Sequence, residues 1–103
     1  MGLLEHLNPR RLREKLGLKQ DEFWTRVGVT QSGGSRYEAG RDMPAPVCEL
    51  LRLVHVERID LSRVRRVDFE IIGYLKVSQP EVYRTLRDTV RQRRSRRALA
   101  ARA

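Results

Sequence analysis

The chain has 103 residues, which is enough for one domain with a modest core but too few for an elaborate enzyme cleft. Its 22 basic and 13 acidic side chains give a formal net charge of +9, which favours a polyanionic partner, nucleic acid ahead of an anionic membrane surface. An arginine-rich surface that only keeps the chain in solution is the simpler alternative. A single cysteine, Cys48, excludes an internal disulfide, and no apolar run suits a signal peptide or a membrane span, so we expect a cytoplasmic protein.

Three short helices are predicted in residues 8–40. The first lies between Asn8, an N-cap followed by proline, and Gly17, a C-terminal stop. The second covers residues 20–27, with two acidic residues in its first turn and an aromatic apolar face. Gly28 ends it, and a threonine caps the third helix, residues 30–39, after a turn of only two residues.

The middle of the chain is less regular. Two prolines predict a loop over residues 41–46, and residues 47–56 follow as a fourth helix with apolar residues at helical spacing. Asp60 is a candidate N-cap for a fifth helix, in which an apolar stripe runs through residues 61–75. The pattern also alternates like a strand in this stretch, so helix and strand both remain open for residues 67–72.

The last part of the chain predicts a helix and a basic tail. Ser78 and Glu81 have the spacing of a capping box, and the helix that they predict keeps apolar residues as far as Val90. Residues 91–103 contain six arginines and no acidic residue. We therefore expect residues 93–103 to be a flexible basic tail.

Residues 17–44, GLKQDEFWTRVGVTQSGGSRYEAGRDMP, resemble the helix-turn-helix of the lambda repressor and Cro family, also called the XRE type. The residues that carry the resemblance are Gln20, the turn at Gly28, the pair Thr30-Gln31, and the ending Ser35-Arg36-Tyr37-Glu38-x-Gly40. It implies an all-α bundle of four to five short helices, with a helical C-terminal extension. The expected domains are a helix-turn-helix domain at 1–60, a dimerising extension at 61–92 and the tail at 93–103.

The resemblance also implies which residues contact double-stranded DNA. The helix at 30–39 would lie in the major groove while the preceding helix crosses the backbone. Base edges would be read by Gln31, Ser32, Ser35 and Arg36, because glutamine suits adenine and arginine suits guanine. Gln20 matches the position that binds a phosphate in the family, and the further backbone candidates are Lys19, Thr30, Tyr37 and Arg41. Tyr37 has an alternative as a core residue, and Gly33 as a point of close approach to DNA.

The chain departs from the family pattern at two positions. Most members have alanine where this chain has Trp24, and isoleucine or valine where it has Gly34. We interpret Gly34 as the space that the Trp24 indole needs, since cores tolerate exchanges that conserve total volume. The alternative is that Gly33 and Gly34 loosen the helix until DNA orders it. Glu38 would repel phosphate, so we expect it to pair with a neighbouring arginine.

No catalytic or metal-binding set is visible in the sequence. His6 and His55 are far apart, neither has metal-ligand spacing with Cys48, and we expect His55 to be a partly buried helix residue. We therefore expect a non-enzymatic regulator of transcription, a repressor, that binds DNA as a homodimer without a cofactor. One alternative is an antitoxin-like chain whose C-terminal half covers a toxin, and another makes the arginine tail an RNA-binding arm.

Overall fold

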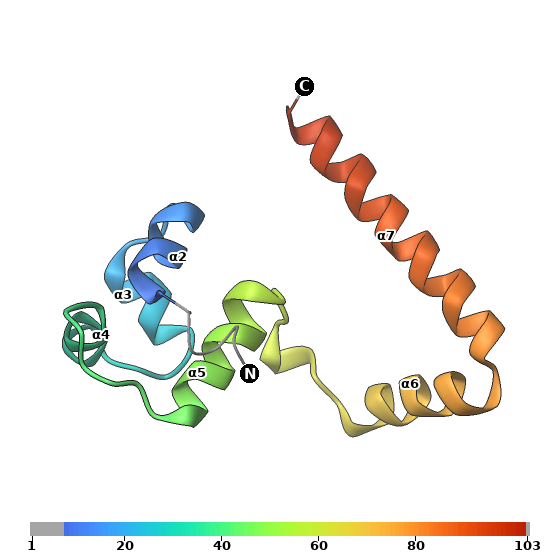
Figure 1. The fold of residues 1–103 in the computed structure, drawn as a ribbon, viewed down its shortest axis with the longest axis horizontal. Helices are drawn as coiled ribbons and strands as arrows, with labels where there is room; N and C mark the ends of the chain where they lie inside the picture. The colour runs from blue at the N-terminus through green and yellow to red at the C-terminus, as the bar shows by residue number, and fades with distance from the viewer. Residues whose placement is uncertain (1–7, 103) are drawn as a thin grey trace. The chain divides into compact units, whose positions relative to one another are not determined.

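The computed structural model describes residues 8–102, which form helices and connecting segments without a strand (Figure 1). The chain divides into two compact units, Met1–Ser62 and Arg63–Ala103. The elements are α2 (Pro9–Leu16), α3 (Gln20–Thr25), α4 (Gln31–Glu38), α5 (Ala45–Leu51), a π-helix (Arg52–Val56), a 3₁₀ turn (Leu61–Arg63), α6 (Arg66–Ser78) and α7 (Pro80–Arg102). The expectation of an all-α helix-turn-helix fold is therefore confirmed.

Local capping explains the first three helices. The Asn8 side chain accepts a hydrogen bond from the Arg11 amide at the start of α2, and Gly17 ends this helix at φ 70°. Thr30 caps α4 in the same way, because its hydroxyl accepts a hydrogen bond from the amide of Gly33 at 3.1 Å. These boundaries agree with the sequence-based predictions to within two residues.

The turn between α3 and α4 begins earlier than predicted. α3 ends at Thr25, and the next residues wind into a tight turn in which the Val29 amide donates to the Trp24 carbonyl at 3.0 Å. Gly28 sits in this turn at φ 76°, where a side chain would be strained. The short turn holds α4 against α3, as a helix-turn-helix requires.

The core of the first unit lies between these helices. Phe23 and Trp24 of α3 are fully buried, and so is Leu51 of α5. Val27 completes the buried cluster, and half-buried apolar residues from α2, α4 and α5 surround it. The two core rings meet edge to face at 5.2 Å, an arrangement that aromatic pairs favour.

The fourth helix differs from its prediction at both ends. It begins at Ala45, because Pro46 falls in its first turn, where the missing N–H is not needed; the predicted loop over 41–46 is therefore two residues too long. Beyond Leu51 the chain widens into a π-helix, which contains His55. The buried His55 ring stacks on Phe23 at 4.0 Å and donates from Nε2 to the Phe23 carbonyl at 2.8 Å.

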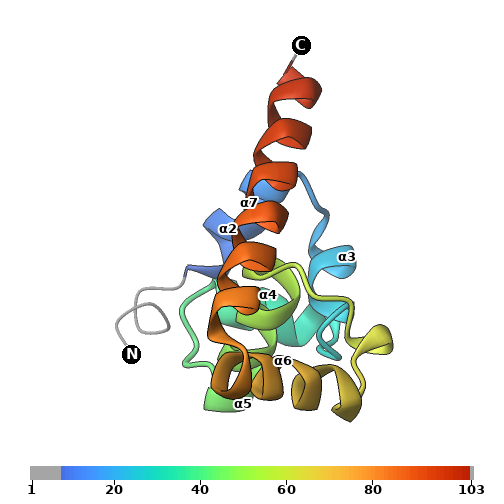
Figure 2. The same cartoon turned by 90° about the vertical axis from the view of Figure 1, so that its right-hand side faces the viewer.

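The second unit consists of α6 and α7, which meet at a sharp bend at Gln79 (Figure 2). Residues 67–72 are helical rather than a strand. The single helix predicted from residue 61 is wrong: Asp60 accepts from the Ser62 amide and hydroxyl in the 3₁₀ turn, and α6 starts only at Arg66.

Two further predictions fail in this unit. Ser78 ends α6 instead of capping α7, so the proposed capping box is not formed. Residues 93–102 continue α7 as one helix, where we predicted a flexible tail. Arginine is a good helix former, and cations near a helix C-terminus are favoured by the macrodipole, which the prediction overlooked.

Candidate nucleic-acid interface

The prediction that Gly34 leaves space for the Trp24 indole is confirmed. Trp24 is fully buried, and Gly34 is the buried residue of α4. A Cβ atom placed on Gly34 would lie less than 3.0 Å from three atoms of the Trp24 ring, a separation that real Cβ atoms do not show. The glycine therefore lets α4 lie directly on the indole.

Glu38 binds the three helices together. Its carboxylate accepts two hydrogen bonds from the Arg13 guanidinium of α2, at 2.9 and 3.0 Å, and one from the Trp24 indole N–H at 2.7 Å. The carboxylate side chain is only 5% exposed. A bidentate arginine pair of this kind fixes orientation as well as adding stability. The expectation that Glu38 pairs with an arginine is confirmed.

The same contacts control the ionisation of Glu38. Burial raises the pKa of its carboxyl, but hydrogen bonds from Arg13, Trp24 and Gln20, with the charge of Arg13, outweigh burial and hold the pKa below its usual value. The carboxylate is therefore charged and fully partnered at neutral pH. Its role is to hold α4 in place, and it is not free to meet a ligand.

The predicted base-reading residues lie on the open side of α4. Gln31, Ser32, Ser35 and Arg36 are all exposed. Within residues 8–102 the Arg36 side chain makes no hydrogen bond or ion pair, so its five donors stay available. Gly33 is half-buried, and an added Cβ would lie 3.2 Å from the Thr30 hydroxyl.

The predicted backbone-contacting residues divide into two groups. Lys19, Thr30 and Arg41 are exposed at the ends of α3 and α4, where phosphates could approach them. Gln20 is half-buried and hydrogen-bonds Glu38, so it has a structural partner. Tyr37 is also half-buried, and its ring lies 5.6 Å from that of Trp24. This position agrees with the alternative prediction that Tyr37 is a core residue.

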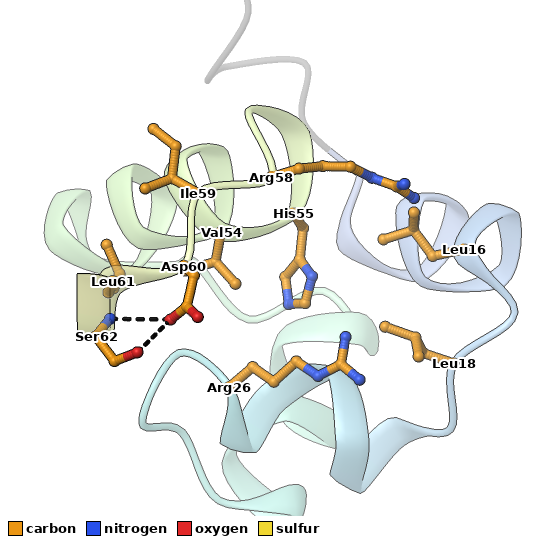
Figure 3. Close-up of a pocket in the computed structure, with 10 residues that line it drawn as sticks. All are labelled: Leu16, Leu18, Arg26, Val54, His55, Arg58, Ile59, Asp60, Leu61 and Ser62. Carbon is orange, nitrogen blue, oxygen red and sulfur yellow. Dashed lines mark hydrogen bonds between the residues drawn. The ribbon is translucent and has the colours of Figure 1, made fainter. Parts of the chain in front are cut away.

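Two features of the first unit were missed by sequence reasoning. One is the role of Arg13, because no local pattern connects it with a glutamate that lies 25 positions further on. The other is an open cavity of about 710 Å³ beside the π-helix (Figure 3). It is lined by Leu16, Leu18, Arg26, Val54, His55, Arg58, Ile59, Asp60, Leu61 and Ser62.

The cavity combines apolar side chains with positive charge. Arg26 and Arg58 extend over it from opposite sides, with His55 between them (Figure 3). Burial lowers the pKa of His55, the two arginines lower it further, and the hydrogen bond to the Phe23 carbonyl opposes them. Arg58 adopts φ 59°, which is uncommon for a residue with a side chain. Because its pKa is lowered and its side chain is buried, His55 is a neutral core residue, and it is more deeply buried than predicted.

Other kinds of site are not found in the part of the chain that the structure describes. No group of three or more histidine, cysteine or acidic residues there could hold a metal ion. None of the described helices is long and apolar enough to cross a membrane.

Comparison with known proteins gives one result. The sequence model of RsaL-like helix-turn-helix domains matches residues 10–54, from α2 into the π-helix. Neither the curated proteins nor the solved structures gave a match. The finer resemblance to the lambda repressor and Cro family therefore stays a prediction. The matched segment and the α3–turn–α4 geometry lead to the same conclusion: the chain contains a helix-turn-helix DNA-binding domain.

Proposed function

We propose that the protein is a sequence-specific transcriptional regulator, a repressor, that places α4 in the major groove of double-stranded DNA as a homodimer. The observation that carries this proposal is the division of α4 into two faces. Gly34 and Glu38 fasten one face to α2 and α3, while Gln31, Ser32, Ser35 and Arg36 are exposed on the other. A helix held from behind with exposed polar side chains in front suits base-edge readout.

Substitution of a base-contacting residue and of a phosphate-contacting residue should affect DNA binding differently. Arg36 is our candidate for a guanine contact, and Lys19 and Arg41 are candidates for phosphate contacts. We expect Arg36→Ala to cost about 1–3 kcal/mol at one position of the binding site and to relax the preference there. Lys19→Ala and Arg41→Ala should weaken all sequences alike and flatten the salt dependence.

The experiment begins by selecting bound duplexes from a random DNA pool with the full chain, which defines the site. Affinities of the variants are then measured on that site and on its single-base changes. Arg52→Ala is a matched control, because Arg52 is bound to Glu49 at 3.0 Å and belongs to the π-helix. Equal weakening of every sequence by Arg36→Ala would remove its assigned role, and selection of no preferred sequence would overturn the proposal.

The second unit supports the homodimer. α6 has exposed apolar residues on most of its circumference, with Val67 and Ile71 on one side and Phe69 and Ile72 on the opposite side. Exposure of these four side chains ranges from 39% to 55%. Apolar side chains exposed on so much of a helix normally pack against another surface, so we assign a partner surface to α6. A second copy supplies one that is self-complementary, and two copies would read two half-sites.

The oligomeric state tests this part of the proposal. The full chain should sediment as a dimer, whereas a fragment of residues 1–62 should be monomeric and bind the site about 100-fold more weakly or worse, because the second half-site is lost. Ile71→Gln should dissociate the full chain, and Glu70→Gln should leave it dimeric. A stable dimer of the fragment would show that the dimer interface lies in the first unit. A second protein that co-purifies at equal amounts would favour the antitoxin alternative.

A further inference from the structure

The C-terminal part of α7 carries five exposed arginines, Arg91, Arg93, Arg94, Arg96 and Arg97, which we call the arginine helix. The last acidic residue of the chain is Asp88. The ion pairs of α7 lie before this segment, at Glu81–Arg84 and Arg87–Asp88. Within residues 8–102 none of the five arginines has an acidic partner, so their charge is uncompensated by the protein itself.

The character of α7 changes abruptly along its length. Val82, Leu86 and Val90 form a row with a spacing of four residues, and the next position in that row is Arg94. At 100° per residue the five arginines cover about 220° of the helix circumference, and Gln92 and Ser95 lie in the remaining arc, so residues 91–97 have no apolar face. An amphipathic membrane helix or a helix that packs on a protein groove needs such a face. The distribution therefore favours a partner that is purely anionic.

The regular helical backbone makes the charge dense. Arg93 and Arg97 are four residues apart, and Arg94 and Arg97 are three apart, so like charges neighbour one another. Such pairs destabilise a helix in water, and a counter-charge relieves the repulsion. Duplex DNA carries a negative charge about every 1.7 Å along its axis, and the arginine helix, residues 91–97, extends over roughly 9 Å at 1.5 Å per residue. Several phosphates thus fall within reach of one arginine helix.

We propose that the arginine helix is a second DNA-contacting element, which binds the sugar-phosphate backbone of the duplex without reading its sequence. This proposal rests on the function proposed above, since the helix-turn-helix domain selects the duplex on which the arginine helix acts. α4 supplies sequence preference, and the arginine helix supplies a large salt-dependent part of the affinity. RNA is a different partner, and the experiment below separates it.

The test compares two triple variants of the full chain that remove the same charge. The first is Arg93→Gln with Arg94→Gln and Arg97→Gln, and the matched control is Arg52→Gln with Arg84→Gln and Arg87→Gln. The control arginines are ion-paired within the protein. Glutamine keeps the helix propensity close to that of arginine, which circular dichroism verifies. Each protein is titrated with a random-sequence duplex and with the selected site over about 50–200 mM salt.

We expect the first variant to lose on the order of 10–100-fold in affinity for both duplexes at about 0.15 M salt, with a salt slope lower by about 2–3. Base preference should not change, and the control should keep the parental slope. Equal slopes in the two variants would overturn the inference, and so would a loss confined to single-stranded RNA of the same sequence. Failure of the parent chain to bind either duplex would instead overturn the function proposed for the first unit.

A second measurement needs no substitution. Trypsin cleaves after arginine, so the uncovered arginine helix should be cut early in the free protein. We expect duplex DNA to slow cleavage after residues 91–97 by about tenfold or more, because phosphate contacts would cover these arginines. Unchanged cleavage of this segment in a complex whose helix-turn-helix domain is protected would contradict the proposal.

Discussion

The two units of the chain use apolar residues in opposite ways. The first unit buries Phe23, Trp24, Val27 and Leu51 among its own short helices. The second contains longer and more regular helices, yet none of its residues within 63–101 is buried. Apolar content therefore does not decide which unit has a core. What decides it is whether the chain returns on itself, as α2 to α5 do and a single bend between α6 and α7 does not.

Of the substitutions that distinguish the two units, Trp24→Ala should cause the largest loss of stability. This change empties the centre of the first unit and removes the N–H donor to Glu38, so we expect a loss of about 3–5 kcal/mol in its free energy of unfolding. Chemical denaturation followed by circular dichroism measures the loss. Val77→Ala in α6 is the control, because Val77 is 84% exposed and its replacement should change stability by less than about 0.5 kcal/mol. Equal losses would mean that the second unit has a core of its own.

A smaller effect should come from the glycine that faces this tryptophan. Gly34→Ile forces a side chain into the indole and should cost about 1–3 kcal/mol, despite the better helix propensity of isoleucine. Combined with Trp24→Ala, the same change fills the cavity and should recover part of that loss, although the hydrogen bond to Glu38 stays absent. A double-mutant cycle measures this coupling. Strict additivity would show that the two residues do not compete for space.

Gly33→Ala is the comparison within the same helix. Its Cβ would lie 3.2 Å from the Thr30 hydroxyl and 3.3 Å from a methyl group of Val29, contacts that require a small adjustment and no repacking. We expect a change in stability within about 1 kcal/mol of zero, since the helix propensity gained offsets the tight contact. A loss as large as that of Gly34→Ile would mean that the whole of this face of α4 is packed.

The last effect concerns pH and should again be confined to the first unit. The folded state lowers the pKa of His55, so the unfolded chain binds more protons once the pH falls below about 6.5. Stability is therefore fully present above that pH and declines below it, by at most about 1.4 kcal/mol per pH unit for one proton. Glu38, whose pKa is also lowered, adds a second decline below its ordinary value near 4.5.

His55→Gln isolates the first decline. Glutamine can donate to the Phe23 carbonyl but does not titrate, so the dependence between about pH 7.5 and 5.5 should flatten. An unchanged slope in His55→Gln would assign the effect to another group.

The contrast between the units also explains which predictions succeeded. Caps and glycine turns act within a few residues, so Asn8 and Thr30 marked the starts of α2 and α4, and Gly28 marked the turn between α3 and α4. The exchange of bulk between Trp24 and Gly34 could be inferred because the family resemblance supplied a spatial pairing. Arg13 was missed, because its bond to Glu38 depends on how α2 and α4 meet in space. The start of α6 was misplaced, because the apolar stripe continues without interruption through the 3₁₀ turn.

The Trp24–Glu38 contact also has a spectroscopic consequence. Trp24 is the sole tryptophan of the chain, and its indole touches α4 through Gly34 and Glu38 and lies beside the Tyr37 ring. Its fluorescence thus reports the seating of α4 on the domain, since a displaced helix would admit water and break the bond to the carboxylate. The second unit has no tryptophan and therefore contributes no tryptophan emission. The protein thereby carries an intrinsic, label-free optical probe located directly behind the helix that we assign to the DNA.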